Sequence, residues 1–410
     1  MKGNLTMART IRLFDQDSHL YSFEARVLGC CPLDHQRFSV VLDQTAFFPE
    51  GGGQYADVGT LNDLQVLDVQ ETRDGVIQHI VSQPFEVGAV VVGQLDGAVR
   101  FRRMQNHTGE HILSGLFFAH FGFQNVGFHL GHDDVTMDID GVLDRAQLDE
   151  IEAEANRAVT ACLPVRAFYP SSDELACMTF RCKDSLLDVG ETDHTGGIRI
   201  VEIEGYDRCA CCAPHVTNTG EIGLIKILDF IHYKGGTRIH ILCGFDALAD
   251  YQWRYKAIRL MANTLSLKQG ELVEGFEKSL KELEGAYRAI SDLRQKLWQQ
   301  KLELLPADNE YLCLFDESAD TMRLAQKVVT KTAQSCRLWC ALFVGNDADG
   351  YRYTIGRGHG FSDVRTITPS LNQALQGRGG GSADMIQGQI VASREQIESF
   401  MARMATADTI

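Results

Sequence analysis

The chain has 410 residues, enough for two to four domains with sizeable cores. Apolar residues make up 44% and charged residues 23% of it, as in an ordinary globular protein. No stretch approaches the roughly 18 consecutive apolar residues of a membrane helix, and the N-terminal segment lacks the apolar core of a signal peptide. These features predict a cytoplasmic protein with no membrane partner.

The formal net charge of −16 argues against a large, nonspecific nucleic-acid surface, although it allows a local basic patch. The twelve cysteines are spread over a long chain without an export signal, so we expect reduced thiols rather than a disulfide framework. One group, Cys209, Cys211 and Cys212, is too dense to be read only as buried apolar residues.

Short alternating apolar runs punctuated by Gly and Asp fill residues 8–100, which predicts a small β-barrel domain at residues 1–100. Residues 101–246 mix two helical patterns, at 101–121 and 148–162, with strand-like runs between 165 and 243. Helices on an antiparallel sheet would make this second domain an α+β layer.

Residues 247–305 lack proline and carry apolar residues at spacings of three, four and seven, from Phe276 to Leu297. This stripe predicts a long helical linker or a helical hairpin with Gly270 at its turn. Residues 306–410 alternate strand and helix patterns and predict a small α/β domain. A glycine-rich loop is expected at residues 377–390. The predicted fold class is therefore α+β, with four segments.

The strongest chemical signal is His107-Thr-Gly-Glu-His111. On a helix, positions i and i+4 share a face, so both imidazoles can reach one metal ion. The string differs from the zinc-protease motif H-E-x-x-H, because Glu110 precedes the second histidine instead of following the first. A protease would lack its general base in this arrangement.

About a hundred residues later, Cys211-Cys-Ala-Pro-His215 places a thiol and an imidazole four residues apart. Two histidines, a cysteine and a third histidine form a set that zinc accepts in tetrahedral geometry. Spacing alone does not choose between Cys211 and its neighbours Cys209 and Cys212. Four protein ligands also fit a closed structural zinc site, because catalytic zinc usually keeps one position open.

A second signal is the segment FFPEGGGQYADVGTL at residues 47–61. Gly51, Gly52 and Gly53 would let the backbone approach a ligand closely, or would simply form a tight turn. Thr45, Gln54 and Asp57 flank these glycines and could orient an ester carbonyl or a small hydroxyl. Further on, Lys234-Gly-Gly-Thr-Arg238 offers two cations for phosphate contacts, with a solvated hairpin turn as the alternative.

Three motifs then coincide in one order: residues 43–61, NHTGEHIL at 106–113, and RIVEIEGYDRCACCAPHV at 199–216, followed by KGGTRI at 234–239. Together they resemble the stand-alone alanyl-tRNA editing proteins of the AlaX type, which are similar to the editing domain of alanyl-tRNA synthetase. Where the family usually reads C-G-G-T-H-V, this chain has CCAPHV. The tail GGGSADMIQGQI resembles the DHH-associated domain at the C-terminus of the synthetase, so the long form of the family is the match.

The resemblance implies a zinc-dependent hydrolase that deacylates Ser-tRNA(Ala), with Gly-tRNA(Ala) as a second substrate, and spares Ala-tRNA(Ala). It implies one zinc ion per chain, and it selects Cys211 over its neighbours as the cysteine ligand. The expected site is as follows: metal ligands His107, His111, Cys211 and His215; catalytic Thr45, Gln54, His107 and His111; substrate contacts Gly51, Gly52, Gly53, Asp57, Thr108, Lys234 and Arg238.

The domain boundaries expected on this basis are a barrel at 1–100, an editing domain at 101–246, a helical linker at 247–305, and a DHH-associated-like domain at 306–410. The last would bind tRNA, dimerise, or do both. The apolar stripe is compatible with a homodimer. Two rival classes are a non-catalytic tRNA-binding protein with a structural zinc, and a phosphoesterase suggested by the tail. The second lacks an Asp-His-His segment in this chain.

Overall fold

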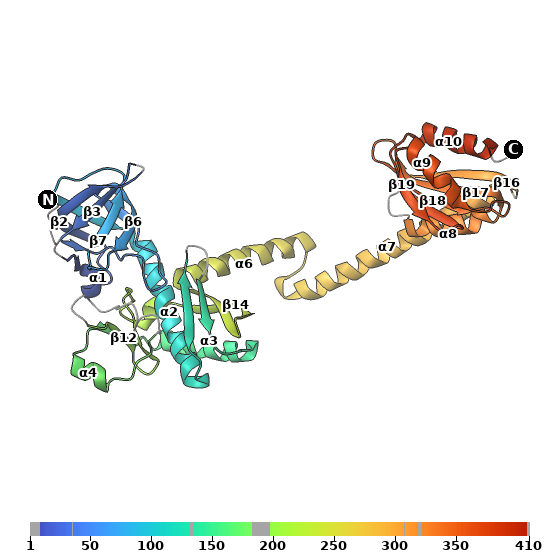
Figure 1. The fold of residues 1–410 in the computed structure, drawn as a ribbon. Coiled ribbons are helices and arrows are strands. Elements are labelled where there is room, and N and C mark those ends of the chain that lie inside the picture. The colour runs from blue at the N-terminus through green and yellow to red at the C-terminus, as the bar shows by residue number, and fades with distance from the viewer. Residues whose placement is uncertain are drawn as a thin grey trace. The chain divides into compact units, whose positions relative to one another are not determined.

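A computed structural model describes residues 9–34, 36–131, 135–182, 197–306, 308–317 and 322–407. The chain divides into two compact units, residues 1–261 and 262–410 (Figure 1). In the described part of the chain, no helix combines the length and the apolarity needed to cross a membrane. The twelve cysteines are free thiols, as expected.

The first unit begins with a closed antiparallel barrel, which confirms the barrel predicted from the sequence. Its strands follow the order β2-β3-β7-β6-β5-β8. They are β2 (Ser22–Pro32), β3 (Phe38–Leu42), β5 (Gly59–Leu61), β6 (Leu64–Glu71), β7 (Ile77–Val81) and β8 (Val90–Leu95). Exposed and buried side chains alternate along β2 and β8, as the pleat requires, and the buried ones fill the barrel core.

Short elements accompany the barrel. Strand β1 (Ile11–Arg12) pairs in parallel with β4 (Gln44–Thr45), and helix α1 (Leu13–Gln16) follows β1 directly. Phe14 of α1 is buried and meets Phe48 edge-on at 5.5 Å. The N-terminal segment is thereby anchored beside the glycine-rich motif.

Helix α2 (Gly97–Phe121) leaves the barrel and passes through the centre of the first unit. Asp96 caps its first turn by accepting hydrogen bonds from the backbone N–H groups of Ala98 and Val99, and Gly122 ends it in the left-handed conformation. Every residue from Met104 to Phe117 is buried. A helix enclosed on all sides can hold polar side chains in fixed positions, provided that they are paired.

Around α2 lie two small sheets and a helix, which together match the expected α+β layer. One sheet has the order β14-β15-β10-β9, with β9 (Asn125–Leu130), β10 (Val135–Ile139), β14 (Ile225–Tyr233) and β15 (Gly236–Cys243) all antiparallel. The other joins β11 (Val165–Phe168), β12 (Ile200–Ile203) and β13 (Asp207–Ala210). Helices α3 (Arg145–Thr160) and α4 (Ser172–Cys177) and the turn η1 (Thr219–Ile222) complete the unit.

The helical region contains two helices rather than one: α6 (Gly244–Leu265) and α7 (Leu272–Glu303). The short 3₁₀ turn η2 (Gln269–Glu271) separates them, and Gly270 lies in that turn. The prediction of helix at residues 247–305, interrupted near Gly270, agrees with these bounds.

The second unit ends in a five-stranded sheet with the order β16-β17-β18-β20-β19. Its strands are β16 (Asn309–Asp316), β17 (Cys336–Asn346), β18 (Gly350–Arg357), β19 (Arg378–Gly381) and β20 (Met385–Ile390). The helices of this unit's C-terminal part are α8 (Met322–Ala333), α9 (Thr368–Ala374) and α10 (Arg394–Ala407), with the turn η4 (Val364–Ile367) before α9. Strands β16 and β17 are parallel and the other pairs are antiparallel.

The prediction of a loop at residues 377–390 is wrong, because most of this segment forms β19 and β20. Gly379 pairs with Gly388, which pairs in turn with Tyr353. A Cβ atom on Gly379 would lie 2.0 Å from the Tyr353 hydroxyl oxygen. Glycine is therefore needed because the Tyr353 side chain lies over β20 and β19, and not because the chain must turn there.

Candidate metal centre

The middle of α2 presents His107 and His111 on one face, as the four-residue spacing predicts. Both imidazoles are buried, with 3% of each residue exposed. Their ring centres lie 5.4 Å apart. Since the helix is fixed at both ends and buried between them, the two rings have little freedom to move.

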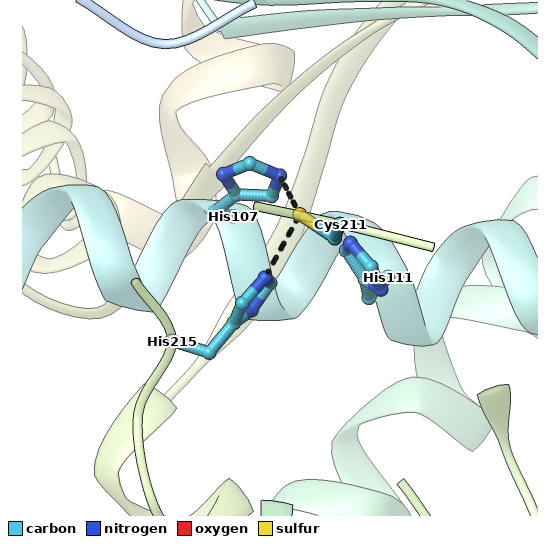
Figure 2. A group of neighbouring side chains, drawn as sticks. All are labelled: His107, His111, Cys211 and His215. Carbon is cyan, nitrogen blue, oxygen red and sulfur yellow. Dashed lines mark hydrogen bonds between the residues drawn. The ribbon is translucent and has the colours of Figure 1, made fainter. Parts of the chain in front are cut away.

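The loop after β13 brings Cys211 and His215 to these rings (Figure 2). Arg199 holds this loop in shape: its guanidinium donates to the carbonyl oxygens of Cys211 at 3.0 Å and Ala213 at 2.8 Å. The Cys211 N–H in turn donates to the Arg199 carbonyl oxygen at 3.1 Å. Asp15 of α1 pairs with the same guanidinium at 3.3 Å, so the barrel's N-terminal segment also supports the loop.

Four potential ligand atoms meet at one point. The side-chain donors of His107, His111, Cys211 and His215 all lie within 4.8 Å of one another. The Cys211 sulfur lies 3.6 Å from Nε2 of His107 and 3.3 Å from Nε2 of His215. Around tetrahedral zinc, with bonds of about 2.0 Å to nitrogen and 2.3 Å to sulfur, neighbouring ligand atoms are about 3.5 Å apart. The cluster therefore has the dimensions of a site that could hold a metal ion.

Each histidine is oriented by a different partner at Nδ1. His107 bonds the side-chain oxygen of Gln54 at 3.0 Å, His111 bonds Asp207 at 2.9 Å, and His215 bonds the Thr108 hydroxyl at 3.0 Å. Partners of this kind fix the ring and its tautomer in metal sites. With Nδ1 used in this way, each Nε2 is left to face the common point.

The charges around the cluster favour a thiolate at Cys211. Burial alone would raise the pKa of this thiol, but His107 and His215 lower it well below its ordinary value. Burial likewise opposes ionisation of Asp207, yet hydrogen bonds from His111 and Arg181 lower the pKa of this carboxyl. Arg181 makes two bonds to Asp207, at 2.7 and 2.8 Å. The surroundings thus favour the anionic form of the Cys211 sulfur and, behind His111, of the Asp207 carboxyl.

The glycine-rich segment reaches the cluster through Gln54. Gly53 has φ +80°, and a Cβ there would lie 2.4 Å from the Phe128 carbonyl oxygen, so glycine is required. The Gly53 carbonyl accepts from Leu130 N–H at 2.8 Å, which fastens the turn to β9. Gln54 is 1% exposed, and within the described residues its Nε2 has no hydrogen-bond partner. A buried donor without a partner at the cluster's edge is suited to meet a ligand.

Two predicted site residues, Thr45 and Asp57, have polar groups that are bonded to residues outside the cluster. The Thr45 hydroxyl bonds Nε2 of His79 at 2.8 Å inside the barrel and accepts from the Phe47 N–H. The Asp57 carboxylate forms a buried ion pair with Arg100 and accepts from the Phe48 N–H. These contacts link Thr45 to the interior of the barrel and Asp57 to Arg100 of α2.

Of the remaining predicted substrate contacts, one lies close to the cysteine motif and others lie on the β14–β15 hairpin. Gly52 is close to the cysteine motif, since a Cβ there would lie 3.7 Å from the Cys212 sulfur, while the space around Gly51 is open. Lys234 and Arg238 lie on the β14–β15 hairpin rather than in the cluster. Lys234 is exposed, whereas Arg238 is bound by Asp138 at 2.6 and 2.7 Å.

The structure also separates the three cysteines that spacing left open. Cys211 lies with the three histidines, whereas Cys209 groups with His111 and Asp207. That second group is a poor metal site because Arg181 already neutralises Asp207. Cys212 is in neither group and packs against the barrel core.

Sequence reasoning missed Asp207, Arg181 and Arg199, the residues that hold the site in place. Asp207 and Arg199 fall inside the motif at residues 199–216, so their position in the sequence was a usable signal. The sequence offered no such signal for Arg181, because this residue lies outside the motif and reaches Asp207 only through its pairing with β13 in the fold.

The fold and the cluster together define the class of protein. It is an α+β protein with a candidate metal centre, where three segments meet: the glycine-rich turn at the barrel, the buried helix α2, and the loop after β13 that carries Cys211. Two family models match parts of this region. The model described as "Threonyl and Alanyl tRNA synthetase second additional domain" matches residues 198–240. The model described as "tRNA synthetases class II (A)" matches residues 30–99.

Relatives extend the match to nearly the whole chain. The chain is 26% identical over 404 residues to the alanyl-tRNA editing protein Aarsd1 of Danio rerio, covering 94% of this chain and 96% of that protein. It is 27% identical over 413 residues to the alanyl-tRNA editing protein AlaX-L of Pyrococcus horikoshii, with 94% and 96% covered. The resemblance to the stand-alone alanyl-tRNA editing proteins predicted from the sequence is therefore confirmed.

A longer relative is the alanine–tRNA ligase of Ignicoccus hospitalis, 32% identical over 308 residues. The match covers 73% of this chain but 33% of the ligase, so this chain spans about a third of that protein. A solved C-Ala domain from the alanyl-tRNA synthetase of Aquifex aeolicus also matches, covering 24% of this chain and 87% of that domain at 17% identity with a TM-score of 0.19.

Proposed function

We propose that this protein is a trans-editing hydrolase that cleaves the aminoacyl ester of mischarged tRNA(Ala). The observation that carries the proposal is the buried cluster of three histidines and Cys211 beside a free Gln54 donor. It lies in a chain similar over almost its whole length to proteins named alanyl-tRNA editing proteins. The partner we propose is tRNA(Ala) carrying serine, with glycine as the second substrate.

The cofactor we propose is one zinc ion, held by His107, His111, Cys211 and His215. The donor set supports zinc because this borderline-soft ion accepts imidazole and thiolate together. When bound, zinc would supply positive charge beside the ester carbonyl. The protein's own part is to hold the ligands still through Gln54, Asp207 and Thr108.

Selectivity has a physical requirement that Gln54 can meet. Serine and alanine differ by one hydroxyl, and a site built to bond that hydroxyl leaves a buried polar group unpaired when alanine enters. The Gln54 side-chain oxygen is engaged by His107, which leaves its Nε2 donor for the substrate. We therefore propose Gln54 as the residue that meets the serine hydroxyl or the ester carbonyl, with the flanking glycines allowing close approach.

For the other predicted contacts the geometry suggests supporting roles. We propose that Thr108 orients His215, that Thr45 and Asp57 stabilise the barrel and its junction with α2, and that Lys234 contacts tRNA phosphate. Lys234 is exposed, as a phosphate contact requires. We also propose the four-segment division at residues 100, 246 and 305 as the functional division of the chain.

A second candidate function is tRNA binding without catalysis, around a structural zinc. One observation favours it: four protein side chains are arranged for one ion, which fills the tetrahedral positions. The two candidates make opposite statements about ester cleavage, so a deacylation assay separates them.

The experiment measures release of amino acid from Ser-, Gly- and Ala-tRNA(Ala) by the purified protein, its Cys211→Ser variant, and Cys209→Ser as the matched control. We expect cleavage of the first two substrates and not of the third, with zinc and activity lost in Cys211→Ser and kept in Cys209→Ser.

Gln54→Glu keeps an acceptor for His107 but removes the donor, and we expect kcat/KM for Ser-tRNA(Ala) to fall about 100-fold. Tight tRNA binding without any cleavage would establish the second candidate instead.

A further inference from the structure

Helix α6 carries a basic stretch within an acidic chain. The whole chain has 39 Lys and Arg against 55 Asp and Glu, yet residues 251–270 contain four cations and no carboxylate. Three of these cations, Arg254, Lys256 and Arg259, lie on α6. A local excess of positive charge is what a protein of net charge −16 needs if it is to hold a polyanion.

Lys256 is the centre of one exposed face of this helix. Gln252 and Trp253 lie four and three residues before it, and Arg259 lies three residues after it. Side chains at these spacings are neighbours on a helix surface. All four are exposed, and 67% of Trp253 is exposed. We call this set, Gln252, Trp253, Lys256 and Arg259, the Trp253 face.

The side chains with which α6 could pack against another helix lie on a different side. Leu248, Tyr251, Tyr255 and Ile258 follow one another at spacings of three and four, which is typical of a helix-packing stripe. Trp253 is two residues from both tyrosines, and therefore about 160° around the helix from each. Packing of this stripe would leave the indole of Trp253 in contact with water.

The cations of the Trp253 face are available to a ligand. Within the described residues, neither Lys256 nor Arg259 has a carboxylate partner, whereas the neighbouring Arg254 is bound by Asp250 at 2.5 Å. Cations beside an exposed aromatic ring are the groups with which proteins hold unpaired RNA, because cations bind the phosphates and the ring stacks on a base. Gln252 adds an amide that can bond the edge of a base.

We propose that the Trp253 face binds the RNA of the substrate tRNA. An unpaired base stacks on Trp253, and Lys256 and Arg259 bind phosphates. The positive charge and the ring together select RNA as the occupant, since a second apolar helix would not need the two cations. Only the identity of the RNA as tRNA(Ala) rests on the proposed function.

The start of α6 is joined to the helix of the candidate metal centre. Asn106, the residue before His107, donates from its side-chain amide to Asp246 at 2.8 Å. Trp253 lies seven residues after Asp246, which is about 10 Å along the helix. The Trp253 face is therefore close enough to contact the same RNA molecule whose aminoacyl end reaches the centre.

The three tryptophans of the chain make a direct measurement possible. Trp298 and Trp339 are 5% and 0% exposed, so iodide in solution should quench the emission of Trp253 and spare the other two. We expect uncharged tRNA(Ala) to lower the emission of Trp253 by stacking and to protect it from iodide. An indole that is already shielded without RNA would mean that another part of the protein covers this face, and would overturn the proposal.

Affinity for uncharged tRNA(Ala) in variants of the full chain is the second measurement. Trp253→Ala should weaken binding about 5- to 100-fold, and Trp253→Phe, which keeps a ring, should retain most of the affinity. Lys256→Ala and Arg259→Ala should each make the slope of log affinity against log salt concentration shallower by about 1. Arg73→Ala removes an exposed cation from the turn between β6 and β7, and as the matched control it should change neither value.

Because every substituted side chain is exposed, circular dichroism should show unchanged helix content. Equal affinity in wild type and Trp253→Ala would overturn the proposal, and so would a wild type that binds no tRNA. These readouts are binding and not activity, so the two proposals fail separately. Ester cleavage with an unprotected Trp253 would overturn this inference alone, whereas a protected Trp253 without ester cleavage would overturn only the hydrolase.

Discussion

At the scale of single residues, the candidate centre depends on what lies behind each histidine. Three imidazoles near one thiolate would repel or reorient one another if Nδ1 were not held. Here an amide, a carboxylate and a hydroxyl hold the three rings. Asp207 is the strongest of these, since it is ionised and itself fixed by two bonds from Arg181.

Replacing Asp207 should therefore weaken the metal centre without removing a ligand. In Asp207→Asn, the carboxylate that orients His111 becomes a neutral amide, and we expect zinc affinity to fall about 10- to 100-fold. Competition against a chromogenic chelator measures this. Cys209→Ser alters a neighbour of the same two side chains and should keep wild-type affinity. Equal affinity in Asp207→Asn and wild type would show that Asp207 does not orient the ring.

His79 makes the barrel sensitive to acid. Burial lowers its pKa from 6.5 to about 4, so the folded barrel holds it neutral while the unfolded chain protonates near pH 6.5. Its contribution to stability is complete above pH 6.5 and is lost as the pH falls from 6.5 towards 4. Between pH 7.5 and pH 5 this amounts to about 2 kcal/mol.

Hydrogen exchange of β3 and β7, followed by mass spectrometry, measures this local stability. We expect protection of these strands to fall with acid in the wild type and to fall less in His79→Gln, which has no proton to gain. Thr45→Val removes the hydroxyl partner of His79 and should lower protection at every pH. A His79→Gln profile parallel to that of the wild type would assign the acid sensitivity to another group.

At the scale of elements, the turn at residues 51–53 connects the barrel to the candidate metal centre, because Gln54 follows it and contacts His107. Gly53→Ala would force a Cβ to within 2.4 Å of the Phe128 carbonyl oxygen and strain a φ of +80°. We expect the turn to detach from β9 and move Gln54, with a loss of at least 10-fold in kcat/KM, because small misplacements at a reacting centre are costly. Gly51→Ala is the matched control, since nothing lies within 4 Å of its Cβ. Equal activity in the two variants would show that this turn does not position the site.

The sequence predicts an element well when neighbouring residues determine it, and poorly when contacts with distant parts of the chain determine it. The alternation along β2 and the four-residue spacing of His107 and His111 are local patterns, and both predictions agree with the structure. The glycine-rich tail was misread because its glycines make room for Tyr353, which lies on another strand. The contacts of Thr45 and Asp57 could not be predicted for the same reason, because His79 on β7 and Arg100 on α2 come next to them only in the folded protein.

At the scale of the whole molecule, the charge of −16 limits how the protein can hold a polyanion. Among the described residues, two arginines that could meet phosphate are already paired: Arg238 is bound by Asp138 and Arg181 by Asp207. If the proposed function holds, we expect tRNA binding to depend on a small number of phosphate contacts and on recognition of the aminoacyl end. The net negative charge also favours quick release of tRNA, which the proposed editing function would need.

Salt dependence tests this directly. Each phosphate neutralised adds about −0.9 on duplex DNA, and about −0.7 on a single strand, to the slope of log affinity against log salt concentration. We expect a slope no steeper than about −4 for tRNA(Ala), and Lys234→Ala should make it shallower by about 1. Lys278→Ala, on α7, is the comparison and should leave the slope unchanged. A steep slope that does not respond to Lys234→Ala would mean that tRNA is held by a basic surface elsewhere on the chain, and that the β14–β15 hairpin does not touch phosphate.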